Sequence, residues 1–232
     1  MKNHKIVSKE EWLIARKELL AKEKKFTHLR DQLSAERRKL PWVKIDKDYI
    51  FDGKNGQQNL IGLFGDKNQL MIYHFMLGPD WDEGCPSCSF WADNFNGIDI
   101  HLAHRDIAFL AVSRADYEKL AAYKKRMGWS FKWLSSLNTD FNYDMGVSFT
   151  PEEKEKNEVT YNYRKQPYFV DELVGVSVFY KNELDEIFHT YSTYSRGTDI
   201  LNGAYNYIDL SPKGRDEGGG IMLWLRRHDQ YE

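Results

Sequence analysis

The chain has 232 residues, of which 41% are hydrophobic and 15% aromatic, enough apolar material for one domain with extensions. A net charge of −2 excludes recruitment of nucleic acid or an anionic membrane by an overall positive field. No apolar run approaches the roughly 20 residues that a membrane helix needs.

The N-terminal residues and the cysteines indicate a compartment. Residues 1–6 lack the apolar stretch of a secretory signal. The only two cysteines, Cys85 and Cys88, have CxxC spacing, which argues against a secreted scaffold held by several disulfides. We therefore expect a cytoplasmic protein with no nucleic-acid partner and no membrane partner.

A long helical segment comes first. Ser8 and Glu11 form a capping-box pattern, and the helix, or two consecutive helices, must end before Pro41. Apolar residues recur behind the cap at helical spacing: Trp12, Leu13, Leu19, Leu20, Phe26, Leu29 and Leu33. Basic and acidic residues alternate between them, as on a solvated face. We expect this arm to pack on its own domain or to form a homo-oligomer with a second copy, the alternative being a groove in a partner protein.

The middle of the chain predicts a βαβ unit. Two short strands, 49–51 and 60–64, are expected around a turn at 52–56. A strand at 70–76 then leads to the cysteines and a helix, and the apolar run 107–112 is typical of a strand buried on both faces. We expect these last two strands to be parallel. Ser113 is expected to cap a helix that continues through Tyr123.

The second half contains an insertion and a hairpin. Residues 130–173 show little periodicity, although Trp129, Phe131 and Trp133 alternate as in a strand. Residues 176–180 and 187–192 predict an antiparallel hairpin, and Thr198 is expected to cap a final helix. We expect three parts: a helical extension at 1–40, a domain at 41–215, and a tail at 216–232 with a short helix.

The cysteines occupy the position expected of a thiol–disulfide site. They follow a strand and a Gly/Pro/Asp loop, and they begin a helix. A cysteine at a helix N-terminus is stabilised as thiolate, and a second cysteine one turn later is close enough to form a disulfide. The order predicts Cys85 as nucleophile and Cys88 as resolving cysteine.

At these residues the sequence resembles the thioredoxin-like superfamily and, more closely, the bacterial family catalogued as domain of unknown function 899. The resemblance extends over nearly the whole chain, and its main motifs are Ser8-Lys-Glu-Glu-Trp12, Leu40-Pro-Trp42, Tyr73-His-Phe-Met76, Gly78-Pro-Asp-Trp81, Gly84-Cys-Pro-Ser-Cys-Ser-Phe-Trp-Ala-Asp-Asn-Phe95, Arg126-Met-Gly-Trp129, Asp140-Phe-Asn-Tyr143, Phe188-His-Thr-Tyr191 and Leu201-Asn-Gly-Ala-Tyr205. It implies an α/β thioredoxin-like fold, a central mixed sheet flanked by helices, with the N-terminal extension and the 130–173 insertion added.

Several neighbours are expected to line the thiol site: Trp81, Asp82, Glu83, Pro86, Ser87, Val174 and Gly175. The indole of Trp81 would shield the sulfur atoms, and the carboxylates of Asp82 and Glu83 would raise the pKa of Cys85 against the helix dipole. Val174 and Gly175 stand where thioredoxins place a cis-proline that helps to bind a disulfide-bearing client, and no proline is present here.

Other functions remain open at this stage. The peroxiredoxin signature is absent, since Gly78 and Asp82 stand at its proline and threonine positions; a divergent peroxidase and a non-catalytic interaction protein are the alternatives. A zinc site formed with His101 and His104 falls one residue short of the finger spacing, so we expect no metal and no cofactor. His189 and Arg196 either line a pocket or are polar tips of an aromatic hairpin. The leading hypothesis is a thiol–disulfide oxidoreductase with an unknown thiol or disulfide client and electron donor.

Overall fold

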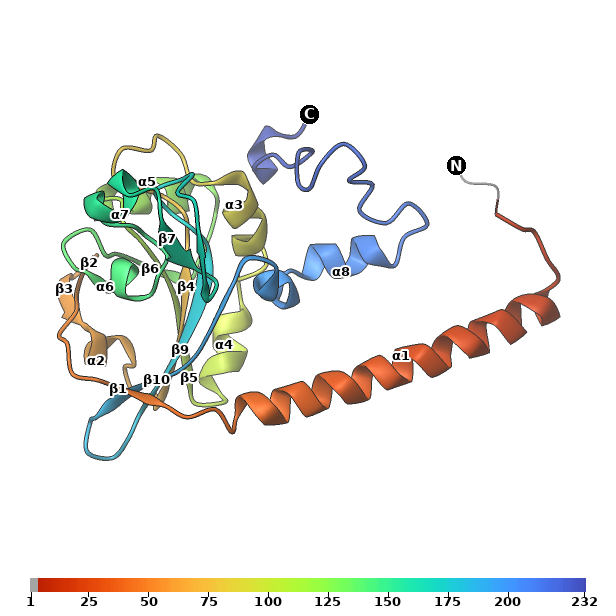
Figure 1. Cartoon of the computed structure of the whole chain (residues 1–232), viewed down its shortest axis with the longest axis horizontal. Coiled ribbons are helices and arrows are strands. Elements are labelled where there is room, and N and C mark those ends of the chain that lie inside the picture. The colour runs from red at the N-terminus through yellow and green to blue at the C-terminus, as the bar shows by residue number, and fades with distance from the viewer. Residues whose placement is uncertain (1–3) are drawn as a thin grey trace. The chain divides into compact units, whose positions relative to one another are not determined.

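The computed structural model describes residues 4–232 and divides the chain into two compact units, Met1–Pro41 and Trp42–Glu232 (Figure 1). The first unit is built around one long helix, α1 (Lys9–Arg37). The predicted capping box is confirmed: the Ser8 hydroxyl accepts from the Glu11 amide at 3.2 Å, and the Glu11 carboxylate accepts from the Ser8 amide at 3.0 Å. No side chain of α1 is buried.

The second unit contains a mixed sheet, which has eight strands in the described part of the chain. Their order across the sheet is β1-β10-β9-β4-β5-β6-β2-β3. The strands are β1 (Val43–Ile45), β2 (Ile50–Gly53), β3 (Gly56–Asn59), β4 (Gln69–His74), β5 (Ile107–Ser113), β6 (Lys132–Ser135), β9 (Gly175–Lys181) and β10 (Ile187–Tyr194). The helices of this unit are α2 (Leu60–Leu63), α3 (Pro86–Ala92), α4 (Ile98–Ala103), α5 (Tyr117–Arg126), α6 (Phe141–Asp144), α7 (Pro151–Glu155) and α8 (Gly203–Asp209).

The four central strands have thioredoxin-like connectivity. β4 and β5 are parallel, with α3 and α4 between them in the sequence. β9 lies antiparallel to β4 on its other side, and β10 lies antiparallel to β9. The predicted parallel pair and the predicted hairpin are both confirmed, and the chain has a thioredoxin-like fold.

Each face of the sheet has its own core. Along β4, Leu70 and Ile72 face a cluster that includes side chains of α2 and α6, whereas Tyr73 faces a cluster that includes α3 and α5. This alternation follows from the two-residue period of a strand. Both cysteines belong to the second cluster, on the face of the sheet that α3 and α5 cover.

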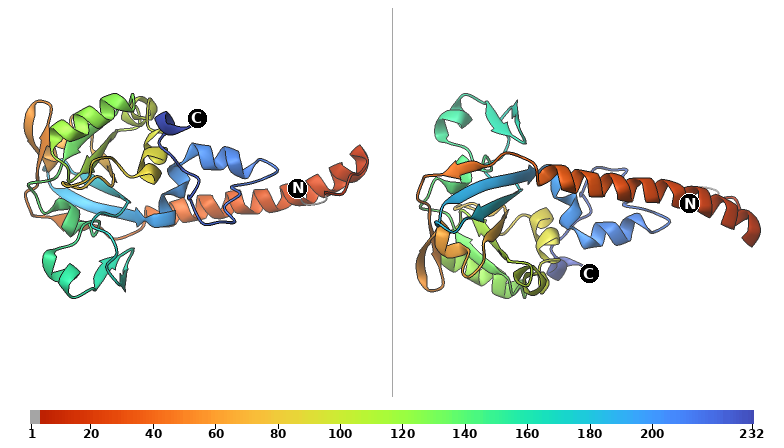
Figure 2. Two further views of the ribbon diagram at one scale, coloured as in Figure 1. Left: turned by 90° about the horizontal axis from the view of Figure 1, so that it is seen from above. Right: turned by 90° about the horizontal axis from the view of Figure 1, so that it is seen from below.

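The 130–173 region divides into a part inside the sheet and a part outside it. β6 pairs parallel with β5 in the main sheet, so the additional elements begin after Ser135. α7 and a separate hairpin, β7 (Val159–Tyr161) with β8 (Arg164–Gln166), form a lobe at the side of the domain (Figure 2).

Some predicted elements were wrong. Residues 60–64 form α2 rather than a strand, because the Asn59 side chain accepts a hydrogen bond from the Gly62 amide and starts a helix. A short apolar run does not distinguish the two structures. The strand predicted from the alternation of Trp129, Phe131 and Trp133 begins only at Lys132.

Two helix starts also differ from the prediction. α5 is capped by Asp116 and not by Ser113, which ends β5. α8 is capped by Asn202, while Thr198 lies in a 3-10 segment, η1 (Ser195–Leu201). The tail consists of turns followed by one short 3-10 helix, η2 (His228–Gln230).

Candidate functional site

Cys85 is the N-cap residue of α3, and Pro86 is its first helical residue. The Cys85 amide donates to the Met76 carbonyl oxygen at 3.0 Å, which returns the loop after β4 to the end of that strand. Gly84 is required here because a Cβ atom would lie 2.7 Å from the Phe75 ring and 2.9 Å from the Tyr123 ring. The loop therefore places the first cysteine directly against the core.

The two thiols are free, and they differ in exposure. Cys88 is 1% exposed, whereas Cys85 is partly exposed. The Met76 amide donates to the Cys88 sulfur at 3.5 Å. An incoming reagent thus meets Cys85 first.

The environment moves the pKa values of the two thiols in opposite directions. Hydrogen bonding from the Cys88 thiol lowers the pKa of Cys85 to about 6 against the effect of burial, and the amides of Cys88 and Ser87 act in the same sense. Burial and then the neighbouring Cys85 raise the pKa of Cys88 well above its ordinary value. The pair therefore holds one proton near neutrality, and that proton stays on Cys88.

The acidic loop does not control this site as expected. Glu83 forms ion pairs with Arg126 and, at 2.8 Å, with Arg227. The hydrogen bond from Arg126 lowers the pKa of the Glu83 carboxyl group. The net pKa shift of Cys85 is downward, so the expected raising effect of Asp82 and Glu83 does not decide its ionisation.

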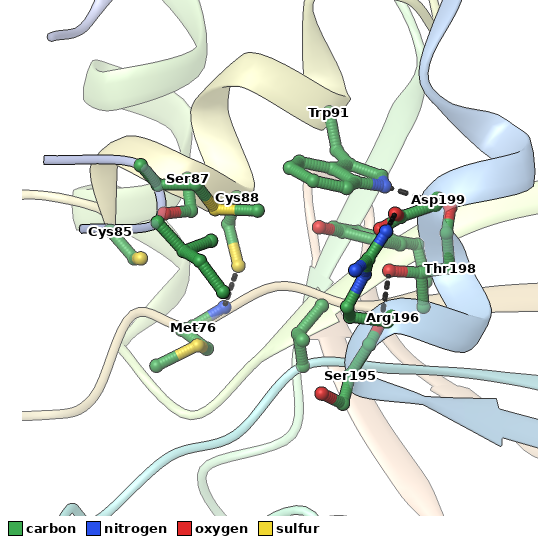
Figure 3. A pocket seen from close by; sticks show the side chains of 13 residues that line it. Met76, Cys85, Ser87, Cys88, Trp91, Ser195, Arg196, Thr198 and Asp199 are labelled. Atoms are coloured by element: carbon green, nitrogen blue, oxygen red, sulfur yellow. Dashed lines mark hydrogen bonds and ion pairs between the residues drawn. The ribbon is translucent and has the colours of Figure 1, made fainter. Parts of the chain in front are cut away.

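A cavity of about 350 Å³ lies beside the thiols (Figure 3). Cys85, Cys88 and Met76 lie on one side of it, and Arg196, Thr198 and Asp199 lie across from them. Its lining consists of Tyr73, Met76, Cys85, Ser87, Cys88, Trp91, Val174, Ser195, Arg196, Thr198, Asp199, Ile221 and Met222. The Trp91 indole donates to the Thr198 carbonyl oxygen at 2.8 Å, which connects α3 to η1 across the cavity.

The structure brings some of the expected site residues to this cavity and not others. Ser87 and Val174 line it together with the two cysteines, but Trp81, Asp82, Glu83, Pro86 and Gly175 do not. Arg196 lines it, with its guanidinium paired to Asp199 at 3.0 Å. His189 does not, because its Nε2 atom bonds the Ser192 hydroxyl at 2.7 Å.

Three groups at the site were not found from the sequence. The Tyr73 hydroxyl is fully buried, has no nitrogen or oxygen partner among the described residues, and interacts with the Cys88 thiol. Ile221 and Met222 of the tail form one wall. Arg227 donates to the Gly84 carbonyl oxygen from both Nε and Nη2, and Nε also donates to the Tyr123 hydroxyl at 2.9 Å. The alternation along β4 could have placed Tyr73 on this face, but the tail carries no periodic signal.

The backbone opposite the thiols is already hydrogen-bonded inside the protein. The Tyr161 hydroxyl donates to the Val174 carbonyl oxygen at 2.8 Å and accepts from the Ser195 amide at 2.9 Å. No cis peptide bond occurs in residues 4–232. The Val174 carbonyl oxygen and the Ser195 amide are thus occupied by one side chain of the protein itself.

A buried polar chain crosses three strands on the other face of β4. His74 Nε2 bonds the Ser177 hydroxyl at 2.9 Å, that hydroxyl bonds Ser192 at 2.8 Å, and Ser192 bonds His189. Burial lowers the pKa of His74 to about 3. This histidine is therefore neutral in the folded protein at ordinary pH.

Comparison with known families bears on the whole chain. Residues 1–231 match the family described as "Bacterial protein of unknown function (DUF899)". The chain belongs to this family. No curated protein gives a significant match. Within residues 4–232, no group of three or more histidine, cysteine or acidic side chains is placed to hold a metal ion, and no helix has the length and apolar character of a membrane span.

Solved structures with a related chain path include peroxidoxin BcpB from Mycobacterium tuberculosis, at 12% identity and a TM-score of 0.45, covering 73% of this chain and 97% of that one. A PrxQ mutant from Xylella fastidiosa has 10% identity and a TM-score of 0.45, with coverage of 72% and 95%. A putative thiol-disulfide oxidoreductase from Bacteroides vulgatus has 15% identity and a TM-score of 0.39, with coverage of 68% and 92%. The fold of this DUF899 chain follows from its own strand order and strand directions, and not from these likenesses.

Proposed function

We propose that the protein is a dithiol–disulfide oxidoreductase in which Cys85 attacks and Cys88 resolves. The Cys85 thiolate attacks a client disulfide, the client S–S bond breaks, and one client thiolate leaves and takes up a proton. The Cys88 thiol then loses its proton and attacks Cys85, which releases the second client thiol. Two electrons pass from the pair to the client, and a separate thiol donor must restore them.

The observation that supports this proposal is the asymmetry of the pair. Cys85 is partly exposed, with its pKa lowered to about 6, whereas Cys88 is buried, with its pKa raised. A low pKa supplies thiolate for attack near neutrality, and burial protects the resolving thiol from outside reagents. A reducing compartment such as the cytoplasm suits a pair that must return to the dithiol.

The experiment is exchange with oxidised glutathione, followed by mass spectrometry. The reduced wild-type protein should form an internal disulfide, and Cys88→Ser should accumulate a glutathione adduct on Cys85. Cys85→Ser should remain unmodified over the same time. Adducts at equal rates on both single variants, or no oxidation of the wild type, would favour a non-catalytic interaction protein.

We also propose that α1 pairs with α1 of a second copy. Trp12, Leu19, Phe26 and Leu33 stand seven residues apart along the helix and are 45–66% exposed. Large apolar side chains at this interval occupy one of the two positions, a and d, at which paired helices bury apolar residues in each heptad. Most of the stability of a helix in water comes from packing its apolar side chains, which a second copy of α1 would supply.

A further inference from the structure

The cavity beside the thiols has the size and composition of a small-molecule site. Its volume of about 350 Å³ lies at the lower end of the range of roughly 300–1,000 Å³ that such sites occupy. Met76, Trp91, Val174, Ile221 and Met222 give it a largely apolar and sulfur-rich lining. Its walls come from the end of β4 with α3, from Val174 with η1, and from the tail, and one side is open to solvent, so a ligand would be held in a half-open cleft.

One buried hydroxyl in the lining has only a thiol beside it. The Tyr73 hydroxyl is fully buried, has no nitrogen or oxygen partner among the described residues, and interacts with the Cys88 thiol. Buried hydroxyls nearly always have a hydrogen-bond partner, so this one indicates an acceptor that a ligand would bring. The Arg196 guanidinium is not free in the same way, because Asp199 accepts from both its Nε and its Nη2 atoms. The Tyr73 hydroxyl is thus the donor that lies in buried, apolar surroundings, whereas Arg196 is a largely exposed, ion-paired cation.

Two main-chain groups next to the cavity are already hydrogen-bonded inside the protein. Tyr161 satisfies the Val174 carbonyl oxygen and the Ser195 amide, and both of these residues line the cavity. Recognition of an extended peptide relies on free main-chain donors and acceptors. A client held by its backbone therefore finds these two groups occupied, which favours a ligand recognised by its side groups and its sulfur atoms.

We infer that the cavity binds a small, mostly apolar organic disulfide as the substrate of the Cys85–Cys88 pair. This inference rests on the proposed function and narrows its substrate class. The S–S bond of the ligand is apolar and polarisable and suits the methionine and tryptophan lining, whereas a hydroperoxide would need donors to both of its oxygen atoms. Tyr73 donates a hydrogen bond to an acceptor on the ligand or to the leaving thiolate. One substrate disulfide and the two protein thiols give two small thiols and the Cys85–Cys88 disulfide.

The test measures single-turnover oxidation of the reduced full-length protein by dipyridyl disulfide and, separately, by oxidised glutathione, which is larger and charged. Each rate is divided by the rate of the same protein unfolded in urea, so the intrinsic reactivity of each reagent cancels. We expect the rate with dipyridyl disulfide to saturate with concentration. We also expect its normalised rate to exceed that of oxidised glutathione by about tenfold or more, which corresponds to useful binding in the cavity.

Two variants examine the cavity itself. Tyr73→Phe keeps the shape and removes the donor, and we expect it to lower the efficiency with dipyridyl disulfide roughly three- to tenfold, as for one lost hydrogen bond. Tyr207→Phe, at a side chain that is 77% exposed, is the matched control and should change nothing. Val174→Phe fills the cavity and should abolish saturation.

A binding measurement covers the case in which Val174→Phe fails to fold. The unreactive thioether dipyridyl sulfide should bind the Cys85→Ser variant, as observed by ligand-detected NMR, and Tyr73→Phe in that background should weaken the binding. A linear rate with no preference over oxidised glutathione, or faster oxidation by an alkyl hydroperoxide, would overturn the inference. If glutathione adducts still form on Cys88→Ser in that case, the proposed oxidoreductase function stands and only the substrate class falls.

Discussion

The guanidinium group of Arg227 donates two hydrogen bonds to the carbonyl oxygen of Gly84, at 3.0 and 2.6 Å. The two residues are 143 positions apart, and Gly84 immediately precedes Cys85. The same side chain pairs with Glu83 at 2.8 Å. The tail thus fixes the loop that precedes Cys85.

Replacing Arg227 with alanine should loosen this loop. The Gly84 carbonyl oxygen loses both donors, and we expect the free energy of unfolding to fall by about 1–3 kcal/mol, as for a buried acceptor left without its partner. Alkylation of Cys85 at a fixed pH should change, whereas Lys213→Ala, at an exposed position shortly before the tail, should behave as wild type. Urea unfolding and iodoacetamide kinetics measure the two effects, and an Arg227→Ala protein with wild-type values for both would show that the tail is not an anchor.

The pH dependence of alkylation should identify the nucleophile. Since the pKa of Cys85 is lowered to about 6, its thiolate fraction rises through that pH and is nearly complete at pH 7. We expect iodoacetamide to label Cys85 with a midpoint near pH 6, and Cys88 to remain unlabelled until the protein unfolds. A midpoint close to that of a free thiol would contradict the geometry described here.

Cys88 should influence the pKa of Cys85 more strongly than the acidic residues Asp82 and Glu83 do. Cys88→Ala removes the hydrogen bond that contributes most to the lowering, so it should raise this pKa. The double variant Asp82→Asn with Glu83→Gln removes negative charge and frees Arg126 and Arg227, so it should lower the pKa slightly. Alkylation profiles compare the two shifts, and a larger effect from the acidic pair would restore it as the main control of the site.

Acid should destabilise the fold through His74. Its pKa is lowered from 6.5 to about 3 in the folded state, so below pH 6.5 the unfolded state binds more protons than the folded state does. The stability that this group provides is complete above pH 6.5 and is lost as the pH falls toward 3, with a slope of up to about 1.4 kcal/mol per pH unit. Urea unfolding between pH 7 and 5 measures the slope. His74→Asn should flatten it, and the exposed control His101→Asn should not; equal slopes in all three proteins would exclude His74 as the cause.

Self-association through α1 should depend on its apolar column. Phe26→Glu places a charge in that column and should convert a dimer of the full chain to a monomer in sedimentation velocity. Lys17→Glu also introduces a negative charge, but between column positions, and should leave the dimer intact. A wild-type protein that sediments as a monomer would rule out pairing of α1.

Local pattern predicted the elements that depend on burial. The run 107–112 and the stretch after Leu70 became β5 and β4 because apolar residues in unbroken sequence favour the centre of a sheet. The cysteines were placed at a helix start for the same local reason. Where a single capping side chain decided the structure, as Asn59 did for α2, composition alone gave the wrong element.

The site was less predictable because its walls come from distant segments. The cavity beside Tyr73 depends on the side chains that η1 and the tail bring to it, and no spacing in the sequence encodes that. Ile221 and Met222 follow a run of glycines with no hydrophobic period. Glu83 was expected to act on Cys85, but two arginines remote in sequence, Arg126 and Arg227, bind its carboxylate.

The hydrogen bonds of Tyr161 complete the end of the β9–β10 ladder where it borders the cavity. Gly175 of β9 pairs with Tyr194 of β10, so Val174 and Ser195 stand where the next pair of this ladder would form. Instead, the Tyr161 hydroxyl lies between the Val174 carbonyl oxygen and the Ser195 amide and bonds both. Neither backbone group is left unsatisfied, although the two strands no longer bond each other there. One border of the space beside Cys85 is therefore the open end of a β-ladder, and the phenol that satisfies this end comes from the additional lobe at the side of the domain.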